Sequence, residues 1–403
     1  MKTNLLTLLS LTLLLSVSSC TIEVNDGTDG VVTAPGATSG VLPDGSKLPN
    51  LITGNLTVKK GNYTLEGIVK VADGATLTIE AGAKFIASTT TTTSLVILQG
   101  GKLIATGSAS EPIVFTTANK TPGGWGGITI YGKAPIKAVN GNATAMSEDG
   151  NTITYGGTDA NFSSGILQYV RTEYAGKKIG DGTSETNSFT FYAVGDGTIL
   201  ENLVAYKGTD DGFEFFGGTV SAKNLVAYGN YDDSFDWQDA WSGQNNSNWF
   251  AFQTVTGNFG MEIEASANID NTAPKISNIT LIRDTNTNPE VAGSVEISAI
   301  QFKRQGTGIF SNVYISGYKN MGGKSAYAVL IQDDATNASQ VNATPSKVVV
   351  SPLNYVNSDN SGVWGYAATN GGKTFTNATT VTKVSLPAGA WATVDGVNLL
   401  SAL

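Results

Sequence analysis

The stretch GTDDGFEFFGGTVSAKNLVAYGNYDDSFDWQDAW, residues 208–241, contains one phrase twice, because DDGFEF at 210–215 returns as DDSFDW at 232–237. An asparagine that precedes a short apolar run also returns, at intervals of 22 to 34 residues, as Asn202, Asn224, Asn248, Asn278 and Asn312. Self-similarity at a period of this length is the signature of a repeat architecture. We therefore expect one structural unit to follow another along the chain.

Each repeat supplies at least two short strands. Besides the runs after the asparagines, FTFY at 189, FEFF at 213, FDWQ at 235, MEIE at 261 and IQFK at 300 alternate between two faces. Two strands in 22 to 34 residues suit one coil of a parallel β-helix, whose coils stack about 4.8 Å apart with like residues aligned. A β-propeller blade needs four strands in about 40 residues and fits less well. The aligned asparagines are expected to form a ladder of hydrogen-bonded amides.

The ends of the chain are expected to lie outside the β-helix. The apolar run from Leu5 to Val17 is too short to span a bilayer, and VSSC at 17–20 resembles a bacterial lipobox. We expect a lipoprotein signal peptide at 1–19, a lipid on Cys20, and a protein anchored in the outer membrane that faces the cell exterior. Residues 20–49 are predicted to be a flexible acidic tether. The parallel β-helix is expected at 50–334, and irregular C-terminal coils or a cap at 335–403.

The composition indicates an all-β protein and excludes several kinds of site. The chain has 48 glycines and only 14% charged residues, and it lacks blocks of helix-forming residues. It contains no histidine, which excludes Ser-His-Asp triads and His-ligated zinc. Its single cysteine excludes an intrachain disulfide. The net charge of −9 argues against nucleic acid as a partner.

Three segments carry a more specific resemblance: GGWGGITIYGKAPI at 123–136, LQYVRTEYAG at 167–176 and DDGFEFFGGTV at 210–220. They resemble a family of secreted and lipid-anchored bacterial β-helix proteins, common in Bacteroidota, that has the pectate-lyase-like architecture. The resemblance covers roughly residues 50 to 330. It implies a right-handed parallel β-helix at the cell surface and leaves the activity open.

Alternation predicts a column of carboxylates on the outer surface. If the phenylalanines of FEFF face the core, then Glu214, Asp236 and Glu262 face outward on three successive coils. Asp211 and Asp233 would lie beside them at the corner of the coil. Two carboxylates about 4.8 Å apart repel by about 1 kcal/mol in water, and by more where water is excluded. Such a column therefore needs a way to neutralise its charge.

Three ways of neutralising the column remain open, and so does the alternative that these acids bind nothing. Ca²⁺ takes six to eight oxygen ligands in irregular geometry, burial can keep a carboxyl protonated, and Lys303 and Arg304 are cations near by. Alternatively, the acids are solvated surface residues and the corner aspartates serve turn hydrogen bonds. The residues expected to bind Ca²⁺ are Asp211, Glu214, Asp233, Asp236 and Glu262.

Aromatic residues beside the acids indicate a carbohydrate ligand. Tyr192 and Phe216 are expected to face outward in the next column, and Trp241 lies in the loop that follows. With Lys303 they are the predicted ligand-binding residues, although a buried position suits Trp241 equally well. If the protein is an enzyme, the candidates for catalysis are Asp211, Glu214, Asp233, Asp236 and Arg304.

Three functions fit these features. The first is a lipid-anchored surface protein that binds an extended glycan along an acidic and aromatic face, with Ca²⁺ as a cofactor and an outer-membrane protein as a further partner. The second is a polysaccharide lyase, with Ca²⁺ on stacked acids and an arginine or lysine base, or a glycoside hydrolase with two opposed carboxyl groups. The third is a structural surface spacer or adhesin. Binding or structural roles rank ahead of catalysis, because a fold alone carries no activity.

Overall fold

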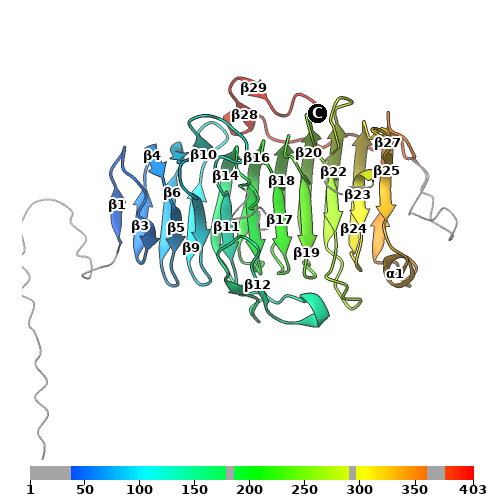
Figure 1. Cartoon of the computed structure of the whole chain (residues 1–403), viewed down its shortest axis with the longest axis horizontal. Coiled ribbons are helices and arrows are strands. Elements are labelled where there is room, and N and C mark those ends of the chain that lie inside the picture. Colours follow the sequence, from blue (N-terminus) through cyan, green and yellow to red (C-terminus); the bar gives the residue numbers. More distant parts are fainter. Residues whose placement is uncertain (1–37, 178–185, 290–295, 361–376) are drawn as a thin grey trace, which may run out of the picture. The chain divides into compact units, whose positions relative to one another are not determined.

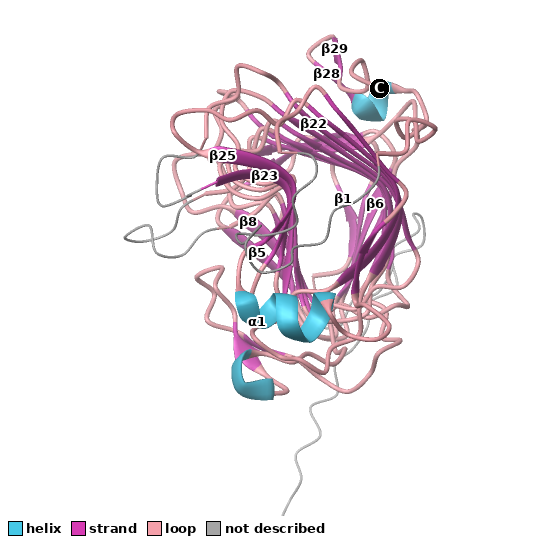
Figure 2. Ribbon diagram, turned by 90° about the vertical axis from the view of Figure 1, so that its right-hand side faces the viewer, coloured by secondary structure: helices cyan, strands magenta, loops and turns pink. Residues whose placement is uncertain are grey.

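The computed structural model describes residues 38–177, 186–289, 296–360 and 377–403. Within these residues the chain forms a parallel β-helix, in which successive coils add strands to two long sheets (Figures 1 and 2). The predicted signal peptide, Cys20 and the tether up to residue 37 lie outside the described residues. The described part contains no helix that is long and apolar enough to cross a membrane.

The larger sheet contains 15 strands. In spatial order its main path consists of β1 (Gly40–Leu42), β3 (Asn55–Val58), β6 (Thr76–Glu80), β9 (Lys102–Thr106), β14 (Gly165–Glu173), β16 (Ile199–Tyr206), β18 (Ala222–Tyr228), β20 (Asn246–Gln253), β22 (Lys275–Arg283), β24 (Gly308–Ser316) and β26 (Val348–Val350). Off this path lie β4 (Gly61–Leu65), β7 (Ala83–Ala87), β10 (Ile113–Thr117) and β27 (Leu353–Val356).

The second sheet contains ten strands. In spatial order they are β2 (Leu51–Ile52), β5 (Ile68–Val71), β8 (Ser94–Ile97), β11 (Ile128–Tyr131), β15 (Phe189–Tyr192), β17 (Phe213–Phe216), β19 (Phe235–Gln238), β21 (Met261–Ile263), β23 (Glu296–Phe302) and β25 (Ser325–Ile331). Each strand pairs in parallel with its equivalent on the next coil, as in the pairing of Phe213 with Phe235. The predicted all-β parallel β-helix is therefore confirmed.

The core is a stack of like side chains. The ring of Phe213 lies 5.1 Å from that of Phe189 and 5.7 Å from that of Phe235, centroid to centroid. All three rings are completely buried. Burial of a side chain of this size stabilises a fold by about 1.5–3 kcal/mol. The repeated phrase of the sequence thus aligns a row of aromatic rings along the inside of the β-helix.

The asparagine ladder is present at the bend inside β16, β18, β20, β22 and β24. The Nδ2 of Asn224, Asn248, Asn278 and Asn312 each donates to the Oδ1 of the asparagine one coil earlier, at 2.9–3.1 Å. All five asparagines, Asn202 included, have φ between 55° and 62°. Asparagine tolerates this left-handed conformation better than most residues. The ladder therefore fixes a backbone bend as well as a hydrogen-bond row.

Both ends of the β-helix differ from the expected boundaries. β1 pairs with β3, so the first coil begins inside the segment 20–49 that was expected to be a tether, and Leu42 packs against the core. At the other end β26 and β27 still pair with β24, and a short helical segment, α1 (Asp334–Thr336) followed by a π-helical turn at Asn337–Val341, buries Val341. Paired strands of the larger sheet therefore continue beyond residue 334.

Residues 377–403, which we call the C-terminal strap, return across the outer face of the larger sheet. They include a two-stranded hairpin of β28 (Thr393–Val394) and β29 (Val397–Asn398). Trp391 and Leu399 of the strap join a buried cluster with Val204, Val226 and Phe250. The guanidinium of Arg171 donates to the carbonyls of residues 390 and 391 at 2.8 and 2.9 Å. The strap thus covers outward apolar residues of β16, β18 and β20.

Candidate functional site

A column of carboxylates runs across three strands of the ten-stranded sheet. Glu214 of β17 pairs with Asp236 of β19, and Asp236 pairs with Glu262 of β21. Thr190 precedes the column and Gln301 follows it, so the predicted alignment is confirmed. The column is nevertheless no freely solvated face, because Glu214 is only 9% exposed and the other two acids are partly buried.

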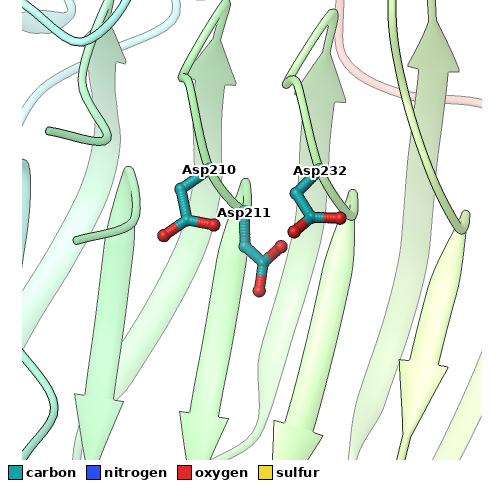
Figure 3. A group of neighbouring side chains, drawn as sticks. All are labelled: Asp210, Asp211 and Asp232. Carbon is teal, nitrogen blue, oxygen red and sulfur yellow. The ribbon is translucent and has the colours of Figure 1, made fainter. Parts of the chain in front are cut away.

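Aspartates from the corner that leads into these strands extend the column. The acids that we call the carboxylate cluster are Asp210, Asp211, Glu214, Asp232, Asp233, Asp236 and Glu262. In each of three groups, 210/211/232, 211/214/236 and 233/236/262, one oxygen from every member lies within 4.8 Å of the others. Figure 3 shows the first group, with Asp210 and Asp211 on one coil and Asp232 on the next. Because residues 211 and 236 are shared, the cluster is continuous.

The second aspartate of each pair also has a structural role. The backbone N–H of Asp211 donates to Asn187 Oδ1 at 3.2 Å, that of Asp233 to Asp211 Oδ1 at 2.9 Å, and that of Phe259 to Asp233 Oδ1 at 2.6 Å. Each side chain therefore caps the backbone of the next coil through one oxygen. These bonds join successive coils and are not hydrogen bonds within a turn, and they leave the second oxygen of Asp211 and Asp233 for another partner.

Asn187 is a member of this site that the sequence analysis missed. It precedes β15 by two residues, as Asp211 precedes β17, so alignment of FTFY with FEFF would have located it. Its amide also donates to Glu214 Oε2, while the amide of Gln238 donates to Glu214 Oε1 at 3.4 Å. By contrast, Oδ1 of Asp236 is buried and has no hydrogen-bond partner among the described residues.

The cluster resists full ionisation. Burial raises the pKa values of Asp211, Glu214, Asp233 and Asp236 well above their ordinary range, and the neighbouring carboxylates raise them further. Ionisation of all four groups at once is therefore unfavourable unless a cation is bound among them. A cation shared among oxygens within 4.8 Å of one another would relieve both the burial of charge and the repulsion.

Two protein cations lie at the edge of the cluster. Lys303 Nζ contacts Glu262 Oε2 at 2.5 Å, and Arg304 contacts Glu264 Oε2 at 3.1 Å. Burial alone would lower the pKa of Lys303, but the carboxylates of Glu262 and Asp236 outweigh burial and raise it above the ordinary value. Lys303 thus offsets one end of the cluster. The ion pair of Arg304 is with Glu264, which is outside the predicted set.

The expected aromatic binding face is not exposed. Tyr192 and Phe216 point outward from the coil as predicted, but both are 1% exposed, and their rings stack at 4.3 Å. Trp241 is likewise 1% exposed and belongs to the main core, where it stacks on Phe215 at 4.6 Å. None of the three aromatics is therefore accessible to a sugar ring, and the prediction of an aromatic surface was wrong.

An insertion between β11 and β14 covers the aromatic column. This covering segment, residues 133–160, contains the antiparallel pair β12 (Ala145–Met146) and β13 (Thr154–Tyr155). Tyr155 packs against Tyr192, and its hydroxyl donates a hydrogen bond to Asp239, which lies one residue after β19. Glu148 of the same segment is close enough to raise the pKa of Glu214. The covering segment thus adds an exposed acid to the edge of the site.

Comparison with protein families gives one match. Residues 50–393 match the family model described as a pectate-lyase like beta helix domain. No curated protein and no solved structure matched the chain significantly.

Proposed function

Because the chain belongs to the family of pectate-lyase-like β-helix domains, we propose that it is a lipid-anchored protein of the cell surface. We further propose that it binds an extended glycan through a Ca²⁺ ion in the carboxylate cluster. The observation that carries this proposal is the continuity of the cluster: three overlapping groups of carboxylates come from three coils. Asp236 belongs to two of these groups, and its buried Oδ1 has no hydrogen-bond partner among the described residues.

Ca²⁺ fits this donor set better than Mg²⁺. The ligands would be carboxylate oxygens delivered from separate coils, and the backbone caps fix Asp211 and Asp233 in position. Ca²⁺ accepts six to eight oxygens in irregular geometry at 2.3–2.6 Å, whereas Mg²⁺ demands a near-ideal octahedron. The ion would extend to Asp211, Glu214 and Asp233 the neutralisation that Lys303 provides at Glu262 and Asp236.

The ion would also provide the contact with the glycan. Because Tyr192 and Phe216 are buried, ring stacking at this face is unavailable. Asp236 and Glu262 are partly exposed, so an ion held between them stays open to solvent on one side. Hydroxyl or carboxylate oxygens of a glycan can complete its coordination shell. Binding should therefore require the ion.

Catalysis, as a polysaccharide lyase or glycoside hydrolase, has weaker support. A lyase base must give up its proton, but the neighbouring carboxylates raise the pKa of Lys303, and Arg304 is paired with Glu264. A hydrolase needs carboxyl groups about 5–5.5 Å or 6.5–9.5 Å apart. In the carboxylate cluster one oxygen from every member of each group lies within 4.8 Å of the others, as a shared cation requires.

Thermal unfolding with Ca²⁺, Mg²⁺ or EDTA tests the cation. An ion that binds only the folded protein adds about 2.7 kcal/mol at 100 times its dissociation constant. We expect Ca²⁺ to raise the Tm more than Mg²⁺ does, and the double variant Glu214→Gln, Asp236→Asn to lose the response. The exposed Glu80→Gln is the matched control and should respond like the wild type. Identical wild-type melts in Ca²⁺ and EDTA would refute the ion site.

Retention on immobilised polysaccharides tests the ligand. The wild type should be retained in Ca²⁺ and eluted by EDTA, and the double variant should not be retained. If Ca²⁺ stabilises the protein but no polysaccharide retains it, the protein is a spacer or adhesin with a structural ion. Release of shortened or unsaturated sugar products would instead establish an enzyme.

A further inference from the structure

Arg283, the last residue of β22, is a buried cation without an acidic partner. It is 3% exposed, and it forms no ion pair with any described residue. Burial lowers the pKa of Arg283 to about 10, which still leaves the guanidinium charged at neutral pH. A buried charge that no opposite charge offsets costs stability unless hydrogen bonds satisfy it. The hydrogen bonds of Arg283 therefore indicate its role.

The guanidinium holds the corner between β20 and β21, residues 254–260, which we call the 254–260 corner. Its Nη2 donates to the carbonyl of Gly257 at 3.0 Å, and its Nη1 donates to the carbonyl of Asn258 at 3.3 Å. Nη1 also donates to Oε1 of Gln253 at 3.1 Å, and Nε2 of Gln253 donates in turn to the carbonyl of Phe259 at 2.8 Å. Three consecutive carbonyls of the corner are therefore held, either directly or through Gln253.

The same peptide groups present their N–H groups to the carboxylate cluster. In a planar trans peptide the C=O and the N–H point in opposite directions. The peptide that contains the carbonyl of Gly257 donates the N–H of Asn258 to the carbonyl of Asp232 at 3.1 Å. The next peptide donates the N–H of Phe259 to Asp233 Oδ1 at 2.6 Å. By binding both carbonyls, the guanidinium thus fixes the direction of both N–H groups.

One coil earlier, the corresponding cap forms in a different way. Asp233 and Phe259 occupy equivalent positions, two residues before the paired strands β19 and β21. The N–H of Asp233 donates to Asp211 Oδ1 at 2.9 Å, and the carbonyl of the same peptide group, that of Asp232, accepts from the N–H of Asn258 on the next coil. There the backbone of the next coil orients the peptide, whereas at the 254–260 corner the guanidinium does.

The planar fork of an arginine suits this position. Arginine presents five N–H donors in a fixed plane, whereas lysine has three donors on a single nitrogen. Besides the corner, Nη2 of Arg283 binds the carbonyls of Thr287 and Asn288, which follow β22, at 3.3 and 3.1 Å. The guanidinium is therefore fixed between two loops. A lysine would keep the charge but would lose several of these contacts.

From these observations we propose that Arg283 is a positioning residue of the carboxylate cluster, which holds Asp233 so that its second oxygen can bind Ca²⁺. Arg283 acts through the backbone of Asn258 and Phe259, whose N–H groups reach the cluster. The inference rests on the proposed function in taking Ca²⁺ as the ion. It adds a residue that lies outside the predicted set and that no pattern of acidic residues would identify.

Calorimetric titration with Ca²⁺ tests the effect on the ion site. We expect Arg283→Gln and Arg283→Lys each to weaken Ca²⁺ binding at least about tenfold, as loss of one hydrogen bond to a charged group allows. The matched control is Arg171→Gln, which removes another buried arginine that binds backbone carbonyls, those of the C-terminal strap. It should lower the Tm but leave the affinity unchanged. Wild-type affinity in Arg283→Lys would assign the effect to charge and overturn the positioning role.

Amide hydrogen exchange in EDTA, followed by NMR, tests the positioning without the ion. In both Arg283 variants the N–H of Phe259 should exchange at least about tenfold faster, because its peptide is released. The N–H of Asp233, which makes the same kind of bond one coil earlier, should keep its protection. A general loss of stability would instead speed both amides equally. Unchanged exchange at Phe259, or equal loss at both amides, would overturn the proposal.

A milder variant covers the case in which the Arg283 variants do not fold. Gln253→Met removes the link to the carbonyl of Phe259 and leaves the guanidinium in place, so it should speed exchange at Phe259 and weaken Ca²⁺. Wild-type exchange and affinity in Gln253→Met would contradict the network. If the wild type binds no Ca²⁺ but exchange at Phe259 alone is lost, the proposed function fails while the hold of Arg283 on the corner stands.

Discussion

Replacement of Asn224 separates the two roles of the asparagine ladder. The side-chain Nδ2 of Asn224 donates to Asn202 Oδ1, and its Oδ1 accepts from Asn248 Nδ2, both at 2.9 Å. The φ of Asn224 is 56°. Loss of two hydrogen bonds costs about 1–3 kcal/mol at about 0.5–1.5 each. An alanine held in the left-handed region costs about 1–2 kcal/mol more. We therefore expect Asn224→Ala to destabilise the protein by about 2–5 kcal/mol.

Asn224→Gly isolates the backbone contribution. Glycine adopts the left-handed conformation freely but enlarges the conformational freedom of the unfolded chain, which costs about 0.4–1 kcal/mol. The glycine variant should therefore be about 1 kcal/mol more stable than the alanine variant, although it loses the same hydrogen bonds. The matched control is Asn245→Ala, an exposed asparagine without a positive φ.

Urea unfolding followed by tryptophan fluorescence measures these differences, because Trp249, next to Asn248, is completely buried. The control should unfold at the wild-type urea concentration. If Asn224→Ala also unfolds there, the ladder contributes nothing to stability. If the glycine variant is as unstable as the alanine variant, the backbone part of the reasoning is wrong.

Two further predictions concern pH and the membrane. The pKa values of Asp211, Glu214, Asp233 and Asp236 are raised in the folded protein above the ordinary values of 3.8 and 4.5. Protonation of these groups therefore stabilises the folded state fully at a pH below the ordinary values, and this stabilisation is lost as the pH rises through the raised values. In EDTA the Tm should thus fall from pH 5 to pH 8, and Ca²⁺ should suppress the fall; a flat profile in EDTA would contradict the buried charge. Cys20→Ala should move the protein from the membrane fraction to the soluble fraction or stall its processing, and unchanged fractionation would refute lipidation.

The repeat made most of the fold predictable. Five asparagines and five alternating segments identified the two strands of each coil, and the register of Glu214, Asp236 and Glu262 followed from the same alignment. A period-2 pattern fixes which side of a strand a residue occupies, and parallel stacking carries that side from coil to coil. Both are local properties that a single sequence contains.

Burial by segments outside the repeat could not be predicted in this way. Alternation placed Tyr192 and Phe216 on the outside correctly, but it does not reveal that residues 133–160 fold over them. The same limit applies to Phe250 of β20, which the C-terminal strap covers from more than 130 residues away in sequence. Non-repeated segments leave no periodic signal, so their docking site depends on surface shape that appears only after the coils have stacked.

The C-terminal strap changes how the last coils can come apart. In a stack whose coils touch only their neighbours, an end coil that opens becomes a free tail and gains its full conformational entropy. Here the N–H of Val384 in the strap donates to Thr280 Oγ1 at 2.8 Å. This bond anchors the strap on β22, which lies before the last coils in the stack. If β24 to β27 open while this anchor holds, they form a closed loop of about a hundred residues with both ends pinned. Because a pinned loop has less entropy than a free tail, fraying from this end is suppressed until the strap itself detaches.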